Sequence, residues 1–338
     1  MNILAVLRRR LLFLVLVVFG VSLITFVISN MIPGDPARLL AGDRASDALV
    51  AQMRDKLGLN QPLYVQYWRY IAGLFQGDLG TSIRTGRPVA EDIAAFFPAT
   101  MELVIVALVM SVVVGVPLGV ASAVWRNGWV DQFARTFAAI GISTPAFWLG
   151  LLLLVGFYGH LGWFPGGGRL STGVEAPARI TGMYVFDGLL TGNLAVAGNA
   201  LWHLVLPALC LGFVHVGVIA RQIRSAMLDQ LSEDYIRTAR AAGLSKPRVI
   251  LGHALPNAAI PSVTVLGLAF GDLLYGAVLT ETIFAWPGMG AYVVNSIGSL
   301  DFPAVMGFTV VVSMAYVLVN LAVDLAYIFL DPRIKEVG

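Results

Sequence analysis

Long apolar stretches separated by polar segments form the main pattern of this chain. The first stretch, Leu11 to Asn30, follows Arg8, Arg9 and Arg10, and its roughly twenty mostly apolar residues are enough to cross a hydrocarbon core of ~30 Å. A cleaved signal peptide would have a shorter apolar region and an A-x-A-like site, and this sequence has neither. The stretch therefore predicts a transmembrane helix, which ends at the helix-breaking sequence IPGDP.

Five further apolar stretches predict five more spans, at residues 99–124, 133–158, about 201 into 221, about 260 onward and about 304–330. Residues 31–98 are mixed in polarity and predict a folded extramembrane segment, with a helix at LGLNQPLYVQYWRYI and turns at GDLGTSIRTGRPV. Glycine is frequent in residues 159–199, which predicts irregular chain outside the membrane. The predicted fold class is an all-α polytopic membrane protein with six transmembrane helices.

This pattern divides the chain into four parts. An N-terminal tail and first span (1–30) precede the extracytoplasmic segment (31–98), which is followed by a core of five helices (99–332) and a short tail (333–338). The core contains one long polar loop, at residues 229–256.

Composition agrees with a membrane protein. Of the 338 residues, 58% are hydrophobic and 12% are charged, whereas a soluble domain has about 25% charged residues. The single cysteine, Cys210, excludes a disulfide framework and a C-x-x-C metal or redox pair within the chain. The net charge of +2 gives no indication of nucleic-acid binding.

The distribution of positive charge predicts the orientation. Of the 22 Lys and Arg residues, thirteen lie on the side of the N-terminus, including Arg333 and Lys335, while the short loops of the other side carry only Arg169 and Arg179. Cytoplasmic loops carry the excess of Lys and Arg. Both termini and the loop 229–256 are therefore expected in the cytoplasm of a cell whose inner membrane holds the protein.

The polar loop predicts two short helices. Ser232 is expected to cap the first, and Glu233 and Asp234 place negative charge at its N-terminus. Gly243 would end it. Ser245 is expected to cap the second helix, with Pro247 in its first turn, and Tyr235, Ala239 and Ala242 are expected to form one small apolar face on the first.

This loop resembles the EAA loop of ABC-importer permeases, because Leu255 and Pro256 follow Gly243 at the family's spacing. Arg237 and His253 depart from the family's Glu and Ile, and YIRTARAAGL is similar to the peptide-permease branch. The resemblance implies that this segment contacts the ATPases and passes on their movement. The residues it marks are Tyr235, Ile236, Arg237, Thr238, Ala239, Arg240, Ala241, Ala242, Gly243, Leu255 and Pro256. An amphipathic basic loop resting on anionic lipid is the alternative.

Other phrases of the chain also resemble peptide permeases, among them IPGDP, GDLG-x-S, GRPV, LTETIFAWPGMG and DPRI. The resemblance implies a type I ABC-importer permease fold, a second related permease, two cytoplasmic ATPases that bind ATP and Mg, and an extracytoplasmic substrate-binding protein, all in contact with membrane lipid. Asp35, Pro287 and Gly288 are candidates for docking the binding protein. A plain structural cap over the translocator is the alternative for the external segment.

Four acidic residues lie in or near the spans. A carboxylate at mid-bilayer costs about 2.5–3.5 kcal/mol on insertion scales, so each needs a structural or functional reason. Asp272 and Glu281 are candidates for the translocation path, although Glu281 and Glu102 also lie near predicted helix ends, where solvation or capping would suffice. Asp324, one turn from Asn320, is expected to bond a neighbouring helix or subunit.

The two histidines of the fourth span, His203 and His215, have no partner at ligand spacing, which favours core residues over a metal site.

No nucleotide-binding or hydrolase motif is present, so the chain is expected to be non-catalytic and to hold no cofactor of its own. The expected function is the permease subunit of an ATP-driven importer of dipeptides or short peptides. Nickel chelates, glutathione and haem are alternative cargoes. A secondary transporter driven by an ion gradient is an alternative mechanism, for which the four acids would form a proton relay.

Overall fold

A computed structural model describes residues 3–31, 35–42 and 44–330. These residues are helical or irregular, apart from an isolated β-bridge between Thr81 and Pro88. The helices are α1 (Ile3–Met31), α2 (Pro36–Ala41), α3 (Asp47–Lys56), α4 (Leu63–Phe75), α5 (Val89–Val124), α6 (Trp129–Ser143), α7 (Ala146–Leu153) with the π-helix η1 (Leu154–His160), α8 (Tyr184–Leu190), α9 (Leu194–Ser232), α10 (Asp234–Ala241), α11 (Lys246–Val249) with the π-helix η2 (Ile250–Ala254), α12 (Leu255–Ile283), α13 (Met289–Gly298) and α14 (Phe302–Leu330).

Five helical segments of the described chain are long and apolar enough to cross a membrane. They are Arg8–Met31, Val89–Val124, Leu194–Ser232, Lys246–Ile283 and Phe302–Leu325. The sixth predicted span is a bent pair, because Trp129–Ser143 and Ala146–His160 meet at 104°. Six spans are thus confirmed when the bent pair counts as one, and the bend within the third span is a feature that the apolar pattern did not predict.

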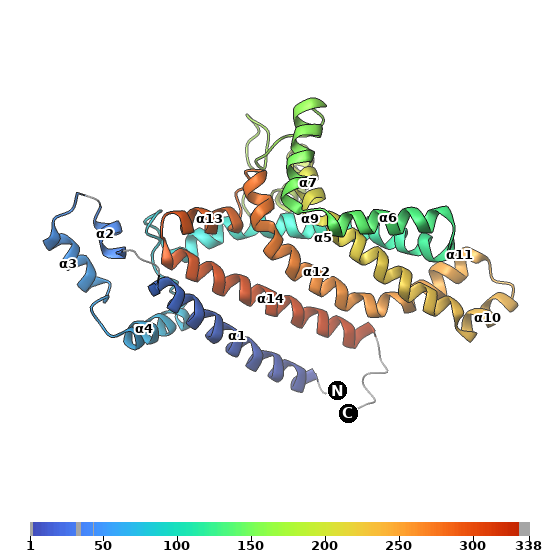
Figure 1. The fold of residues 1–338 in the computed structure, drawn as a ribbon, viewed down its shortest axis with the longest axis horizontal. Helices are drawn as coiled ribbons and strands as arrows, with labels where there is room; N and C mark the ends of the chain where they lie inside the picture. Colours follow the sequence, from blue (N-terminus) through green and yellow to red (C-terminus); the bar gives the residue numbers. More distant parts are fainter. Residues whose placement is uncertain (1–2, 32–34, 43, 331–338) are drawn as a thin grey trace.

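The bend has a local cause in Thr144 and Pro145. A residue that precedes proline avoids the α conformation, and Thr144 is extended, with φ −85° and ψ 120°. Pro145 has no N–H to continue the helical ladder. Helix α7 therefore leaves the direction of α6 and projects sideways from the bundle (Figure 1).

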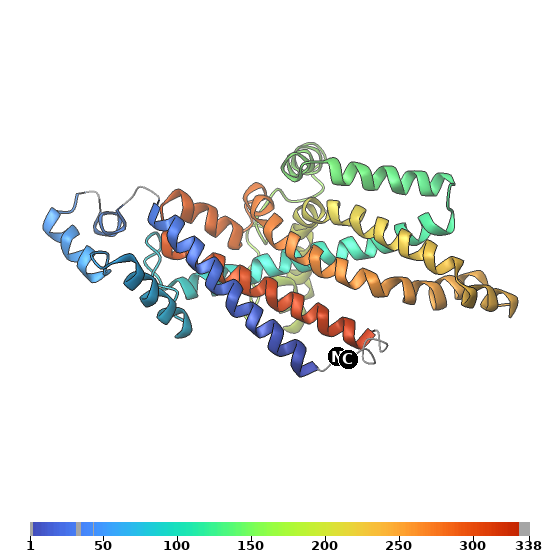
Figure 2. The ribbon, with the colours of Figure 1, turned by 60° about the horizontal axis from the view of Figure 1, so that its bottom comes forward.

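The other helices run mostly along one direction, so the molecule has two distinct ends (Figure 1). The start of α1, the end of α14 and the α10–α11 hairpin lie at one end, which the charge distribution assigns to the cytoplasm. Helices α2–α4 and α13 lie at the opposite, external end. Helices α1 and α14 lie side by side (Figure 2), and Arg10 forms an ion pair with Asp324 between them.

Glycines allow the central helices α5 and α9 to pack closely. A Cβ on Gly119 would lie 2.6 Å from the carbonyl oxygen of Ala220, and a Cβ on Gly212 would lie 2.9 Å from that of Ala107. Small residues that let backbones approach are typical of helix contacts in membranes. This pair carries the core against which α6, α8 and α12 pack.

The extracytoplasmic segment contains the helix that its sequence predicts, α4, together with α2 and α3, which were not predicted individually. Tyr67 and Ile71 of α4 are buried against Phe26 of α1, and the Tyr67 hydroxyl lies 3.1 Å from Ser22 Oγ. The predicted turns at GDLGTSIRTGRPV are also confirmed, because this stretch has no helix before Val89 and carries three glycines at positive φ. The division of the chain into four parts stays a prediction, and the tail 333–338, with Arg333 and Lys335, lies outside the described residues.

Several helices are longer than their apolar stretches. The second begins at Val89, the fourth extends from Leu194 to Ser232, and the fifth begins at Lys246. Polar helix ends outside a bilayer keep their backbone hydrogen bonds, so hydropathy alone predicts only the membrane-embedded part. The predicted irregular region is confirmed for residues 161–183, whereas residues 184–199 contain α8 and the start of α9.

Candidate functional sites at the two ends of the bundle

At the cytoplasmic end, α10 is closed by a glycine turn. Gly243 has φ +79°, its N–H donates to the Arg240 carbonyl at 3.0 Å, and the Leu244 N–H donates to the Ala239 carbonyl at 3.3 Å. This is a Schellman motif, in which a residue in the left-handed conformation ends the helix. The prediction that Gly243 ends the first short helix is confirmed, and the turn fixes the direction of the chain into α11.

The face of α10 that packs inward differs from the predicted one. Ile236 and Ala239 are buried, while Tyr235 and Ala242 are exposed. Ile236 and Ala239 join a core cluster with Ile223, Met227, Val249, Ala254 and Ala258. The prediction of a single apolar face formed by Tyr235, Ala239 and Ala242 is therefore wrong, because Ala239 packs against other helices of the same chain.

The outward side of α10 consists of exposed residues, which are Tyr235, Arg237, Thr238, Arg240, Ala241 and Ala242. Arg237 pairs with Asp234 at 3.0 Å, an exposed pair that contributes little stability. The Tyr235 hydroxyl donates to Gln230 Oε1 at 2.7 Å and accepts from Asn257 Nδ2 at 3.1 Å, so one side chain links the end of α9 to the start of α12. The Tyr235 side chain therefore connects α10 to two long helices.

Both predicted serine caps lack their capping bonds. Glu233 is the N-cap of α10, and the Ser232 hydroxyl donates to the Asp229 carbonyl at 2.7 Å instead. Ser245 occupies the N-cap position of α11 without a side-chain bond, and Pro247 lies in the first turn as predicted. Backbone geometry and the glycine turn, rather than hydroxyl caps, set these helix starts.

Leu255 and Pro256 lie at the start of α12, directly after η2. Proline removes one N–H from the helical ladder and crowds the preceding turn. A π-helical turn is wider than an α-helical one, so η2 accommodates Pro256 without breaking the helix that extends from Lys246 to Ile283. The Leu-Pro pair thus marks the junction between the hairpin and the span.

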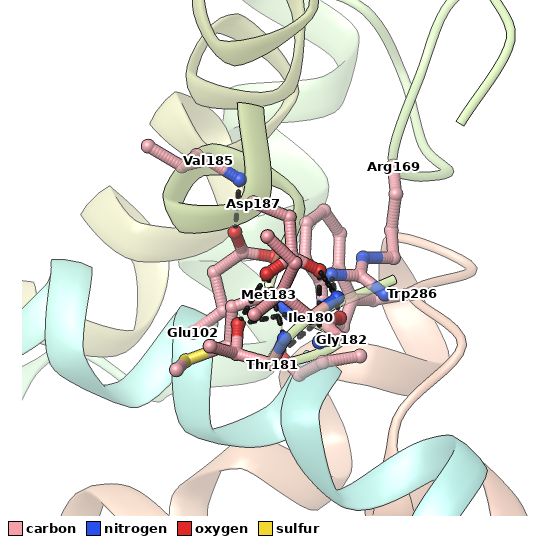
Figure 3. A network of polar contacts seen from close by, with 10 residues as sticks. Glu102, Arg169, Ile180, Thr181, Gly182, Met183, Val185, Asp187 and Trp286 are labelled. Atoms are coloured by element: carbon pink, nitrogen blue, oxygen red, sulfur yellow. Dashed lines mark hydrogen bonds and ion pairs between the residues drawn. The ribbon is translucent and has the colours of Figure 1, made fainter. Parts of the chain in front are cut away.

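At the external end, a buried ion pair joins α5 to the irregular residues 161–183, which we call the glycine-rich loop (Figure 3). Arg169 Nη2 donates to Glu102 Oε2 at 2.6 Å and to the Gly182 carbonyl at 2.8 Å, and the Val185 N–H donates to Glu102 Oε1 at 2.6 Å. The Arg169 guanidinium also lies 3.5 Å from the centre of the Tyr184 ring. Glu102 is 0% exposed, which excludes solvation as the explanation for this carboxylate, and Arg169 neutralises its charge within the protein.

Asp187 organises the same loop next to Glu102 (Figure 3). Its carboxylate accepts bonds from the Thr181 N–H and hydroxyl, each at 2.7 Å, from the Gly182 N–H at 2.9 Å and from the Ile180 N–H at 3.3 Å. Burial opposes ionisation, but these hydrogen bonds outweigh it and lower the pKa of the Asp187 carboxyl. The loop is therefore held by an ionised group at neutral pH.

Glu281 holds the second external loop. Its carboxylate accepts from Thr100 Oγ1 at 2.5 Å and from the N–H groups of Gly290 at 2.7 Å and Ala291 at 3.1 Å, at the N-terminus of α13. A Cβ on Gly288 would lie 2.2 Å from Glu281 Oε1, so this position has no room for a side chain. Glu281 and Gly288 are both buried, while Pro287 is exposed.

Asp35, the other docking candidate, has internal partners. It caps α2 through the N–H groups of Ala37 and Arg38 and pairs with Arg54 at 2.6 Å. Partial burial opposes these contacts, which nevertheless lower the pKa of the Asp35 carboxyl. Of the three docking candidates, Pro287 is the exposed one, whereas Gly288 is buried and Asp35 is bonded within the chain. The docking role of all three stays a prediction.

Asp272 lies on an exposed face of α12. Leu268, Tyr275 and Leu279 are exposed with it, at spacings that keep them on one side of the helix. The nearest end of α12, Ile283, is about 17 Å away at ~1.5 Å per residue, so the carboxylate lies deep in the span. A carboxylate at that depth requires water or a partner, and the buried Nδ1 atom of His215 in α9 also has no hydrogen-bond partner among the described residues.

His203 and Asn320 are satisfied within their own helices. The Nδ1 atom of His203 lies 2.9 Å from the Asn199 carbonyl oxygen, which confirms a core histidine, and Asn320 Nδ2 donates to the Tyr316 carbonyl at 3.0 Å.

The sequence reasoning missed the long-range partners of the external acids. Asp301 accepts from the Ser82 hydroxyl at 2.5 Å, and Asp92 accepts from the Tyr292 hydroxyl at 3.3 Å. The available signal for Arg169 was its rarity, since it is one of two basic residues in the short external loops. No local spacing connects it to Glu102.

Comparison with known families identifies two matches that cover most of the chain. Residues 115–336 match the family described as binding-protein-dependent transport system inner membrane component. Residues 3–104 match the N-terminal region described for membrane components of the same systems.

Individual relatives are similar over nearly the full length. The chain is 66% identical over 334 residues (99% of this chain, 98% of the relative) to the protein named "Probable D,D-dipeptide transport system permease protein DdpB" of Escherichia coli (strain K12). It is 44% identical (98% of this chain, 99% of the relative) to the dipeptide transport system permease protein DppB of Alkalihalophilus pseudofirmus. It is 41% identical (97% of each) to the glutathione transport system permease protein GsiC of Salmonella paratyphi A.

Proposed function

This chain belongs to the family of inner membrane components of binding-protein-dependent transport systems, and we propose that it imports short peptides as one half of a two-permease translocator. It is a multi-pass permease subunit. Two cytoplasmic ATPases bind and hydrolyse ATP with Mg, an extracytoplasmic binding protein delivers cargo, and this chain supplies no catalytic group. Proton-gradient drive is the competing mechanism, and vanadate distinguishes the two, because it stops uptake by an ATP-driven importer while the proton gradient persists.

The proposed cargo is a dipeptide, with D,D-dipeptides as the first candidate. Support comes from the 66% identity to the D,D-dipeptide relative, against 44% and 41% for the dipeptide and glutathione relatives. Cells that express the whole transporter should take up labelled D-Ala-D-Ala, with L-Ala-L-Ala and glutathione as weaker competitors. Stronger competition by glutathione would replace the dipeptide assignment.

We propose that the exposed side of α10 is the surface through which the ATPases contact this chain and pass on their movement. This helix projects at the cytoplasmic end (Figure 1), is anchored by Ile236 and Ala239, and leaves Arg240 and Ala241 free to enter a groove of an ATPase. The two contacts of Tyr235 then transmit movement to α9 and α12.

Charge on this exposed surface tests the coupling proposal. Ala241→Asp should weaken ATPase co-purification and uptake while the chain remains inserted, since Ala241 is exposed and a charge there needs no burial. Ala51→Asp, on an exposed position of the external helix α3, is the matched control and should leave both unchanged. If the loop only rests on lipid, Ala241→Asp will have little effect, and joint neutralisation of Arg237, Arg240, Lys246 and Arg248 will cause the loss instead.

Asp272 is our proposed path residue, and Glu281 is a weaker candidate because its carboxylate is already occupied. The exposed face of α12 around Asp272 would meet the second permease or the water-filled path between the two subunits. Asp272→Asn should change the relative uptake of cationic and anionic dipeptides without loss of assembly, because Asn keeps the size but removes the charge. Equal uptake ratios in both proteins would remove Asp272 from the path.

A further inference from the structure

A cavity of about 280 Å³ lies between α5, α6 and α9 in the cytoplasmic half of the bundle. Its lining includes three arginines, one hydroxyl and small apolar residues, which are Ser122, Ala134, Arg135, Ala138, Ala220, Arg221 and Arg224. None of these residues belongs to the coupling loop or to the external network. The cavity therefore has no role in the function proposed above.

Two of the three arginines have positive charge that no acidic group among the described residues neutralises. Asp131 is 1% exposed and receives Arg224 through two bonds, Nε to Oδ1 at 2.7 Å and Nη2 to Oδ2 at 2.8 Å. Its remaining capacity is taken by the Ser122 hydroxyl at 2.7 Å and the Asn127 N–H at 2.9 Å. Asp131 thus compensates Arg224 alone.

Arg135 and Arg221 are exposed at the mouth of this cavity. Within the part of the chain that the structure describes, neither guanidinium forms an ion pair. The cavity therefore presents two planar, always-charged donor groups that can bind an anion through paired N–H bonds.

The position of the cavity matches the cytoplasmic headgroup layer. Arg135 lies six residues beyond Trp129 at the start of α6, about 9 Å along the helix at ~1.5 Å per residue. Trp125 and Trp129, at the α5–α6 corner, are 59% and 80% exposed, and exposed tryptophans are typical of the membrane–water interface. Phe133 is also exposed on the outer side of α6, so the cavity opens beside an apolar surface.

We propose that Arg135 and Arg221 bind a phosphate group in this cavity, and that an anionic phospholipid of the cytoplasmic leaflet supplies it. Basic pockets between helices on the cytoplasmic side fit such headgroups. The bound lipid would join α6 to α9 beside the Asp131–Arg224 pair. Soluble inorganic phosphate would satisfy the same two arginines, so the experiment has a separate arm for it.

The test uses the assembled transporter, purified in detergent with equal amounts of phosphatidylglycerol and phosphatidylcholine, with native mass spectrometry to count retained lipids. Each basic side chain near an anionic lipid strengthens binding about fivefold, so Arg135→Gln/Arg221→Gln should lower the affinity for phosphatidylglycerol by about 25-fold, measured from the retained lipid at sub-saturating concentrations. Arg126→Gln is the matched control, because Arg126 is exposed at the same α5–α6 corner but does not line the cavity. Arg135→Lys/Arg221→Lys keeps the charge but loses the paired N–H donors, so its affinity for phosphatidylglycerol should lie between those of the wild type and the Gln variant.

The outcomes show whether the two arginines bind a phosphate group and whether that group comes from a lipid or from solution. Arginine-dependent retention of phosphatidylglycerol over phosphatidylcholine supports the lipid proposal. If inorganic phosphate raises the unfolding temperature of the wild type but not of the Gln variant, and lipid shows no preference, the site stands with a soluble ligand. Equal retention of both lipids by the wild type, together with no phosphate effect, overturns the proposal whether or not the Gln variant folds.

Discussion

The external ion pair between Glu102 and Arg169 provides a direct test of what holds the glycine-rich loop. Arg169→Met would remove the bond at 2.6 Å to Glu102 and the bond at 2.8 Å to Gly182, while the unbranched side chain retains much of the packing. Glu102 would remain buried with the Val185 N–H as its partner. Breaking a buried pair from one side costs about 3–5 kcal/mol, because it leaves an uncompensated charge.

This cost should appear first as local opening of the loop. Arg179, on the exposed part of the loop, is a trypsin site, and cleavage there follows the population of the open form. At 1.4 kcal/mol per factor of ten, a loss of about 3 kcal/mol raises the cleavage rate about 100-fold. Arg54→Met is the matched control, since it breaks an external but exposed pair and should cost less than about 1 kcal/mol.

A double-mutant cycle completes this test. Glu102→Gln/Arg169→Met leaves no unpaired charge at this position, so its cleavage rate should be lower than the two single changes predict together, by a coupling of about 0.5–3 kcal/mol. Cleavage of Arg169→Met within threefold of the parent, or strict additivity in the cycle, would refute the assignment of the pair as the loop's anchor.

Three other changes test separate parts of the structure. Ala239→Asp should lower the free energy of unfolding by about 2 kcal/mol or more, measured by thermal unfolding, because it buries a charge in the subunit's own core. Ala241→Asp, at an exposed position, should not have this effect, and equal unfolding temperatures of the two variants would argue against the inward orientation of Ala239. Gly288→Ala should lower the free energy of unfolding by about 1–3 kcal/mol, because the added Cβ would clash with Glu281. Gly298→Ala, whose Cβ would have no atom within 4 Å, should leave the unfolding temperature unchanged, and equal stability of the two variants would contradict the clash. Asp187→Asn should lower the unfolding temperature by an amount that is constant from about pH 5 to 8 and shrinks below about pH 4, and a difference confined to pH 6–8 would contradict this. The reason is that a carboxyl group with a lowered folded-state pKa stabilises the fold above its unfolded pKa and loses this effect as the pH falls through its folded pKa.

The sequence predicted the spans and the hairpin well, because both depend on short-range features. Apolar length determines where a helix can cross a bilayer, and the glycine at position 243 has the left-handed conformation that ends a helix. The inward face of α10 depended on where α9 and α12 lie, so Ala239 could not be assigned to its own core from spacing alone.

Proline shows why the bent third span was not predicted. Pro98 and Pro117 lie inside α5, Pro207 lies inside α9 and Pro261 lies inside α12, yet these helices continue. Pro145 ends α6. Neighbouring helices decide whether the freed backbone groups are satisfied, so the residue type alone does not distinguish a kink from a break.

The Glu102–Arg169 bond also constrains how the protein is made. Glu102 leaves the ribosome with α5, but Arg169 follows 67 residues later, which takes about 3–13 s at typical rates of bacterial synthesis. During that interval the carboxylate has no cation to neutralise it, so the external end of α5 would have to remain hydrated or shielded by the insertion machinery. Stable insertion of the second span would therefore depend on translocation of the glycine-rich loop, which brings Arg169 to the external side of the membrane.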